Sequence, residues 1–218
     1  MKKLYPDSGI ELSKFTASNY DKLMNIASFG KYKGFINKAI KDLDIKPKDK
    51  ILDMGCGTGR NILLMNKYAG KDSLLTGLDI SEDMERQFLR NSISYQNINF
   101  INKRIDRPFE LDQKFDKVFV SFVIHGFPHE IRKIIIKNAY NNLKPDGTFN
   151  ILDFAEFDMN KMPFHHRFIF KKVECKYAFD FIERDWKLIL KEYGFNEFSE
   201  SYYLKKYVRL LKAEKYSE

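Results

Sequence analysis

The sequence predicts a doubly wound α/β fold: a seven-stranded, mostly parallel sheet with an antiparallel C-terminal hairpin and a helical N-terminal cap. Two observations predict it. Between residues 50 and 154, short apolar runs of strand length alternate with segments whose apolar residues recur at helical spacing. Such alternation is typical of βαβ units on a parallel sheet. The last two apolar runs, at 195–203 and 205–211, are close enough in sequence to pair as a hairpin.

The apolar pattern also places the individual elements. We expect strands at 50–54, 74–79, 97–102, 114–121 and 148–154. We expect helices at 18–43 (bent near Gly30 and Gly34), 61–68, 81–93, 130–143 and 183–193. Ser81 is a candidate N-cap and Gly194 a candidate C-cap. Residues 144–147, Lys-Pro-Asp-Gly, have the signature of a type I turn, whereas residues 158–176 show no regular period.

The size of the chain fits one large domain better than two. It has 218 residues, of which 44% are hydrophobic and 31% charged, so enough apolar side chains are present for a core. We expect a helical cap over residues 1–45 and one α/β domain over residues 46–218. That domain contains an aromatic and basic insert at 158–176.

The net charge bears on the kind of partner, and the cysteine content bears on the cellular compartment. The net charge of +8 attracts nucleic acid, an anionic membrane surface or an acidic small molecule, and a Lys-rich solvated surface accounts for it equally well. Cys56 and Cys175 are isolated, so we predict no metal site and no disulfide framework. The N-terminus has no apolar signal region and no apolar run is long enough to span a bilayer. These features predict a cytoplasmic protein, with peripheral membrane contact as an alternative.

A glycine-rich turn follows the first predicted strand. Gly55, Gly57 and Gly59 let the backbone approach a ligand closely, and the helix beyond them presents free N–H groups. Asp79 ends the next strand, where a carboxylate can accept both hydroxyls of a ribose. Asp53, two residues before the loop, would repel a pyrophosphate but suits an ammonium group. Together these residues favour S-adenosylmethionine (SAM) as the cofactor over a nicotinamide dinucleotide.

These motifs resemble those of the class I SAM-dependent methyltransferases, which have a Rossmann-like sheet. Residues 51–59, Ile-Leu-Asp-Met-Gly-Cys-Gly-Thr-Gly, are similar to the first motif of that family and include Cys56 in the cofactor loop. Residues 78–81, Leu-Asp-Ile-Ser, resemble the second motif, whose acid holds the ribose. The resemblance implies that the chain binds SAM and transfers its methyl group.

The same resemblance implies further cofactor contacts. Ile80, Ile105 and Asp106 fall where the family frames adenine, and Ser121 ends the strand that faces the methyl group. The sequence departs from the family at Arg104, where an Asp or Asn is common.

Two further stretches, 20–30 and 143–154, resemble the signatures of the ubiquinone/menaquinone-biosynthesis C-methyltransferases. This branch implies a small or lipophilic acceptor, with C-methylation of a quinol-like ring as the expected reaction. An RNA-modifying methyltransferase and a non-catalytic SAM-binding regulator are the alternatives.

Three residues are candidates for the chemistry. His125, just past the fourth strand, is the first candidate for a general base or a substrate contact, the alternative being a loop histidine. Tyr20 either closes over the cofactor, as the resemblance implies, or packs between helices. Asp153 either orients a hydroxyl group or caps the end of its strand. The insert at 158–176 suits a lid over a lipophilic substrate, a segment touching anionic lipid, an RNA contact or a plain surface loop.

Overall fold

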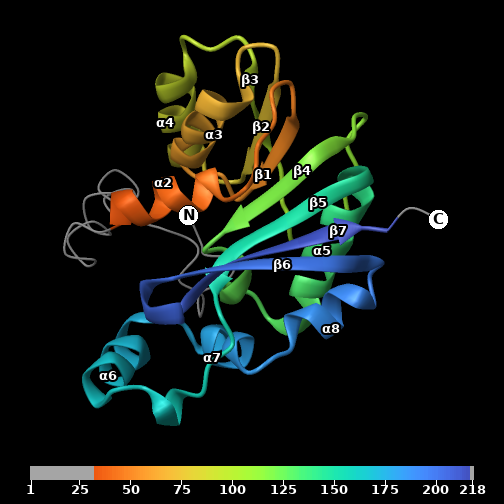
Figure 1. The fold of residues 1–218 in the computed structure, drawn as a ribbon. Helices are drawn as coiled ribbons and strands as arrows, with labels where there is room; N and C mark the ends of the chain where they lie inside the picture. The colour runs from red at the N-terminus through yellow and green to blue at the C-terminus, as the bar shows by residue number, and fades with distance from the viewer. Residues whose placement is uncertain (1–31, 217–218) are drawn as a thin grey trace.

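The computed structural model describes residues 32–216, which form a seven-stranded sheet in the order β3-β2-β1-β4-β5-β7-β6 (Figure 1). The strands are β1 (Lys50–Met54), β2 (Leu74–Asp79), β3 (Ile98–Asn102), β4 (Phe115–Ser121), β5 (Leu143–Phe154), β6 (Phe195–Tyr203) and β7 (Val208–Lys215). Neighbours among β1 to β5 are parallel, whereas β7 is antiparallel to both β5 and β6. The predicted fold class is confirmed.

The central strands are apolar because helices cover both faces of the sheet. In β1, Leu52 and Met54 belong to one core while Ile51 belongs to the other, as the two-residue period of a strand requires. In β4, Val118 and Phe119 divide in the same way. Parallel pairing then brings the carboxyl ends of β1, β2, β4 and β5 to one edge of the sheet.

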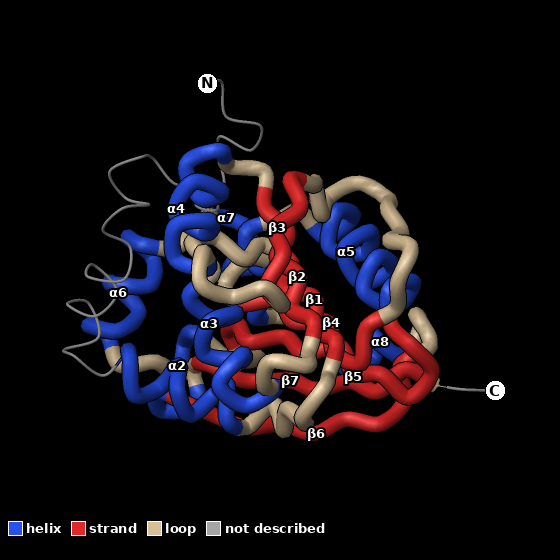
Figure 2. Tube along the Cα trace, turned by 90° about the horizontal axis from the view of Figure 1, so that it is seen from above, coloured by secondary structure: helices blue, strands red, loops and turns tan. Residues whose placement is uncertain are grey.

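The helices form one layer on each face (Figure 2). The first layer holds α2 (Tyr32–Lys41), α3 (Arg60–Ala69) and α4 (Glu82–Ser92), and the second holds α5 (His129–Asn142), α7 (Lys176–Ile182) and α8 (Trp186–Lys191). Phe35, Ile36 and Ile40 of α2 are buried, as their spacing predicts. Each such side chain contributes about 1.5–3 kcal/mol on burial, so α2 is held by packing on the sheet.

Helix ends follow local chemistry. The Ser81 hydroxyl accepts a hydrogen bond from the Met84 amide at 3.4 Å, which confirms the predicted N-cap of α4. Glu82 and Asp83 lie in its first turn, where the helix dipole favours negative charge. Gly194 has a φ of 87°, but the prediction that it is the C-cap of the last helix is wrong, because α8 ends at Lys191 and its C-cap is Glu192.

The structure corrects the prediction that residues 158–176 are irregular. They contain a 3-10 turn, η2 (Met159–Lys161), and a ten-residue helix, α6 (Phe164–Val173). The helical period is hidden in the sequence because aromatic residues lie on two sides of α6: Phe164 and Phe168 are exposed, whereas Phe170 is buried.

Two smaller predictions are also wrong. The helix expected at 183–193 starts only at Trp186, because Asp185 caps α8 by accepting a hydrogen bond from the Leu188 amide at 3.0 Å. Residues 144–147 lie within β5, and Asp146 has a φ of 59°. A type I turn requires a negative φ at that position, so the turn is of another type.

The predicted helix from residue 18 lies mostly outside the described residues, and the cap over residues 1–45 stays a prediction. Within residues 32–216, none of the helices combines the length and the apolar character needed to cross a membrane.

Candidate active site

The glycine loop joins β1 to α3 at the carboxyl edge of the sheet. Gly55, Gly57 and Gly59 all have positive φ, at 80°, 54° and 78°. The amides of Gly55 and Cys56 donate to the carbonyl of Leu78 at 2.8 and 2.9 Å, which fixes the loop to the end of β2. A Cβ at Gly59 would meet the Phe88 ring at 2.6 Å, so a glycine is required there for space as well as for conformation.

The thiol of Cys56 points away from the loop into the core. A Cβ at Gly77, in the middle of β2, would lie 2.6 Å from the Cys56 sulfur, so this glycine makes room for the thiol. Burial, together with the charges of Asp53 and Asp79, raises the pKa of Cys56 well above its ordinary value. Cys56 therefore offers the loop its backbone, and its protonated thiol is a poor nucleophile.

Asp53 is a buried carboxylate whose two oxygens have no hydrogen-bond partner. Burial and the charge of Asp79 raise its pKa to about 8. An unpaired buried carboxylate is costly unless a cation compensates it. The ammonium group of SAM is such a cation, and the orphaned Asp53 beside the glycine loop fits this cofactor.

Asp79 is already half satisfied by backbone. Its Oδ2 accepts from the Gly57 amide and its Oδ1 from the Ser81 amide, both at 3.0 Å. A carboxylate offers about four lone-pair positions, so two are left for a ribose diol. Burial raises the pKa of Asp79, and the backbone hydrogen bonds partly oppose this rise.

The predicted adenine residues follow adjacent strands, Ile80 after β2 and Ile105 after β3. Ile80 is partly exposed, whereas Ile105 and Asp106 are buried. Arg104 forms a two-point ion pair with Asp106, with Nε 2.9 Å from Oδ1. The departure from the family pattern at Arg104 thus has a structural role: it holds the Asp106 carboxylate in place.

Ser121 ends β4, and its hydroxyl accepts a hydrogen bond from the side-chain amide of Asn61 at 2.9 Å. The other polar atom of that amide, Oδ1, is buried without a partner. Asn61 lies in the first turn of α3, beside the glycine loop, and was not singled out in the sequence. It can offer a hydrogen-bond acceptor to a ligand at this edge.

The structure brings His125 and Asp153 together. His125 lies in η1 (Ile124–Gly126), and its Nδ1 is 2.7 Å from Oδ1 of Asp153 near the end of β5. Burial disfavours the charged imidazole, but the charges of Asp153 and Glu174 outweigh burial and raise the pKa of His125 above its ordinary value. Val123, two residues earlier, lies against Gly55, so this pair sits next to the cofactor loop.

Two charged residues at this site were missed in the sequence. Glu174, just after α6, places Oε2 3.7 Å from Nε2 of His125. Arg132 is fully buried and donates to the carbonyls of His125 and Tyr177 at 3.0 and 2.6 Å, and to Asp180 at 2.6 Å. Glu174 is the single acid in 159–176, and Arg132 lies at helical spacing from the buried Ile135 and Ala139, so both carry a faint sequence signal.

Aromatic rings surround the His125–Asp153 pair. The Phe154 and Phe181 rings lie 5.0 and 6.4 Å from the imidazole, and Phe170 of α6 packs on Phe154. This apolar surround suits a flat, lipophilic ligand. Tyr20, the other catalytic candidate, lies outside the described residues.

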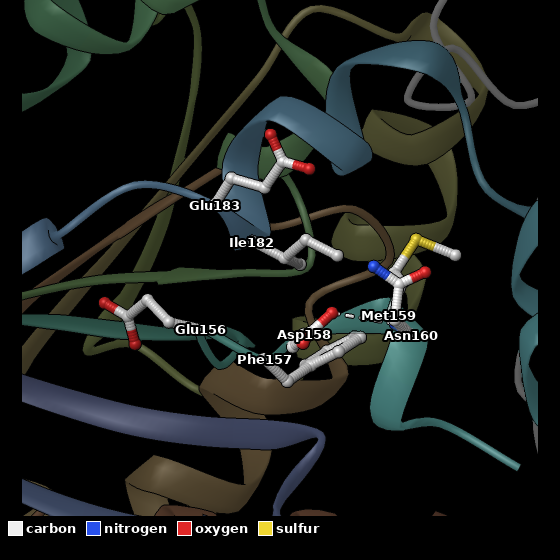
Figure 3. Close-up of a pocket in the computed structure, with 7 residues that line it drawn as sticks. All are labelled: Glu156, Phe157, Asp158, Met159, Asn160, Ile182 and Glu183. Carbon is white, nitrogen blue, oxygen red and sulfur yellow. Dashed lines mark hydrogen bonds between the residues drawn. The ribbon is translucent and has the colours of Figure 1, made fainter.

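A cavity of about 480 Å³ lies beside the segment between β5 and α6, lined by Glu156, Phe157, Asp158, Met159, Asn160, Ile182 and Glu183 (Figure 3). It includes none of the individual catalytic or cofactor residues predicted from the sequence, although residues 158–160 belong to the predicted insert. Glu156 is held by the Arg209 side chain at 2.6 Å and the Trp186 amide at 3.2 Å. The cavity is therefore not assigned to the cofactor.

A seven-stranded sheet with this order, a glycine loop after β1 and an acid ending β2 define the class I methyltransferase fold. The chain belongs to the ubiE/COQ5 methyltransferase family, whose model matches residues 10–196. The predicted class, branch and cofactor, SAM, are thereby confirmed.

Similar proteins agree with this assignment. A demethylmenaquinone methyltransferase of Staphylococcus aureus (strain JH9) is 30% identical over 141 residues, which are 64% of this chain and 57% of that protein. The match thus spans little more than half of the relative. Among solved structures, a SAM-dependent methyltransferase from Aquifex aeolicus has a TM-score of 0.66 at 17% identity, over 94% of this chain and 99% of that one. Magnesium protoporphyrin IX methyltransferase from Synechocystis, with bound SAH, has a TM-score of 0.60 at 19% identity, over 84% and 81%.

Proposed function

We propose that this protein transfers the methyl group of SAM to a ring carbon of a small, lipophilic, quinol-like acceptor. The observation that carries the proposal is the pair of the partly buried His125 and the buried Asp153 beside the glycine loop, with 2.7 Å between Nδ1 and Oδ1. The family supports the transfer, and the name of the Staphylococcus relative supports a quinone-type ring.

Each half of the site has its own task. Asp53, Asp79 and the glycine loop hold the cofactor, with Ile80 and Ile105 on either side of the adenine. Ser121 lies at the strand that faces the methyl group, and Tyr20 closes over the cofactor. The acceptor ring occupies the aromatic surround of His125.

SAM supplies an electrophilic methyl group on a sulfonium. The protein therefore has to hold the acceptor in line and exclude water. A quinol carbon becomes nucleophilic when the neighbouring hydroxyl loses its proton. Nε2 of His125 takes this proton, because Nδ1 is engaged with Asp153. Formation of the carbon–carbon bond would break the methyl–sulfur bond, and the sulfur would leave as the neutral thioether of S-adenosylhomocysteine. The proton on the methylated carbon then leaves to solvent, and His125 returns its proton to the ring oxygen.

Asp153 and Glu174 support the protonated histidine. Asp153 fixes the tautomer that leaves Nε2 free, and Glu174, 3.7 Å from Nε2, stabilises the imidazolium by charge. Glu174 is too far for a strong hydrogen bond in this arrangement, so it leaves Nε2 accessible to the acceptor.

The proposal is tested with SAM labelled on its methyl group and a reduced, short-chain naphthoquinol, with the product analysed by mass spectrometry and NMR. We expect a C-methylated ring. An O-methylated product would refute the proposal that a ring carbon receives the methyl group. Label that passes only to added RNA would refute the proposal that the acceptor is a quinol. SAM binding without transfer to either acceptor would make the protein a regulator.

The pH profile gives a second readout of the base. Because His125 must be neutral to accept a proton and its pKa is raised, the rate should increase with pH around a midpoint above 6.5. Asp153→Asn removes the charge that raises this pKa, so the midpoint should move to lower pH. An unchanged midpoint would show that another group is the base.

A further inference from the structure

Helix α6 carries an exposed aromatic face. The side chains of Phe164 and Phe168, one turn apart, are 74% and 52% exposed, and their rings stack with centroids 6.4 Å apart. On the opposite face Phe170 is buried and packs on Phe154, Phe157 and Phe179. Two adjacent exposed phenylalanines are unusual on the water-facing surface of a protein, and they indicate a site that contacts another molecule.

The surroundings of this face are basic. Residues 159–173 contain four Lys or Arg and no Asp or Glu, and Lys172 lies over the Phe168 ring with Nζ 5.2 Å from its centroid. The neighbouring turn η3 (Leu204–Lys206) adds a half-exposed leucine and two exposed lysines. The hydroxyl of Tyr207, the residue directly after this turn, lies 3.3 Å from Nδ1 of His166 in α6, so the turn and the helix are neighbours.

We propose that α6 and η3 form a docking surface for an anionic lipid bilayer, with Phe164 and Phe168 inserted at the level of the headgroups. A ten-residue amphipathic helix with phenylalanine on one side and Lys and Arg around it suits binding in the plane of the interface. The lysines meet the negative charge of the lipid phosphates. Figure 1 shows α6 at a projecting corner of the molecule, next to the turn between β6 and β7.

A bilayer fits this surface better than RNA does. The two phenylalanine rings stack on each other, with 26° between their planes, and present one joint apolar patch. Single-stranded RNA is bound by separate rings along a groove, each open to one base. Binding of RNA is therefore treated as an alternative result of the test below.

The docking surface is continuous with the proposed acceptor site. Glu174, which faces His125, follows α6 directly, and Phe170 links α6 to the Phe154 ring beside the imidazole. Packed aromatic side chains thus connect the inner face of α6 to His125. The use of this connection by a substrate rests on the proposed lipophilic acceptor, whereas docking itself does not.

The test is co-sedimentation of the whole protein with lipid vesicles, in the absence of SAM and acceptor. One set of vesicles is phosphatidylcholine alone and the other contains about one third phosphatidylglycerol. We expect binding to the anionic vesicles only. Phe164→Ser combined with Phe168→Ser, and separately Lys171→Gln combined with Lys172→Gln, should each weaken it at least roughly tenfold.

Matched controls lie on other parts of the surface. Leu89 and Ile93, spaced like the phenylalanines and 51% and 85% exposed, give the apolar control Leu89→Ser with Ile93→Ser. Lys46→Gln with Lys48→Gln gives the charge control, since both lysines are exposed. Neither control should change vesicle binding, and circular dichroism checks that each variant is folded.

Several results would overturn the proposal. One is that the protein does not bind anionic vesicles, and another is that the α6 variants and their controls lose vesicle binding equally. A third is salt-sensitive RNA binding that requires the two phenylalanines, in a protein that does not bind vesicles. A fourth is a dimer that the double phenylalanine substitution dissociates without changing vesicle binding. Turnover of a water-soluble short-chain quinol by the wild-type protein reports separately on the proposed function. Docking without that turnover would refute the function and leave the docking surface standing.

Discussion

The carboxyl ends of β1 and β2 carry a buried carboxylate, Asp53, and a partly buried one, Asp79, and within residues 32–216 neither oxygen of Asp53 has a hydrogen-bond partner. The ends of β4 and β5 bury charge as well, but there His125 is paired with Asp153, and the buried Arg132 with Asp180. We therefore expect a cationic ligand to complete the proposed cofactor half, whereas the side chains of the proposed acceptor half are already paired. Five predictions test this difference, and the first four are given from the largest expected effect to the smallest.

The largest effect is expected in the acceptor half. His125→Gln removes the general base, so methyl transfer to the quinol should fall about 10²–10⁴-fold. The affinity for SAM, measured by isothermal titration calorimetry, should stay within about twofold of the wild type. His129→Gln, four residues away and outside the pair, is the control. A large loss of SAM affinity in the His125 variant would show that the two halves are not separate.

Arg132→Leu tests the preassembled charge. It leaves Asp180 and three carbonyls without their buried partner, so the free energy of unfolding should fall by about 3–5 kcal/mol. Urea denaturation measures this change. Arg184→Leu is matched, because Arg184 also pairs with Asp180 but near the surface, and should cost less than about 1 kcal/mol. Equal losses would mean that burial of Arg132 adds nothing.

Asp79→Asn tests the cofactor half. The neutral amide accepts hydrogen bonds from the ribose less strongly than the carboxylate, a loss of about 1.5–3 kcal/mol or roughly 10–150-fold in the Kd for SAM. Asp83→Asn, an exposed ion-pair partner of Arg86 in α4, should leave the Kd unchanged. An unaltered Kd for SAM in the Asp79 variant would contradict the role of Asp79 in binding the ribose.

The effect that is smallest when taken per unit of pH concerns the proton at Asp53. Its pKa is about 8 in the folded protein and near 3.8 in the unfolded chain, so the folded state binds the extra proton between these values. The free energy of unfolding of the cofactor-free protein should therefore decrease as pH rises from about 4 to about 8, by at most about 1.4 kcal/mol per pH unit from this group. Asp53→Asn should remove that contribution. Denaturation at several pH values measures it, and parallel curves for wild type and variant would contradict it.

Ligand binding should report the same proton. Pairing with an ammonium favours the ionised carboxylate, so SAM binding near pH 7 should release protons from the wild type and fewer from the Asp53→Asn variant. Calorimetry in buffers of different ionisation enthalpy detects this release.

The two halves also differ in how far the sequence predicts them. The glycine loop and Asp79 are local motifs, in which residue type and spacing carry the chemistry. His125 and Asp153 could each be singled out at strand ends, but their contact depends on the parallel register of β4 and β5. Glu174 is positioned by α6, and this helix is hard to predict from the sequence because aromatic residues lie on both of its sides. Long-range placement of this kind has no signature in spacing.

Gly77 shows how far the demands of the cofactor loop extend into the sheet. It lies in the middle of β2, yet any side chain there would collide with the Cys56 thiol at 2.6 Å and with Ile62 and Phe88 at 2.9 and 2.8 Å. A substitution at residue 77 would displace the cofactor loop from below, without touching a ligand. Residue 77 therefore has to remain without a Cβ for the loop to keep its place, and residue 56 can hold only a side chain that fits the space beside Gly77.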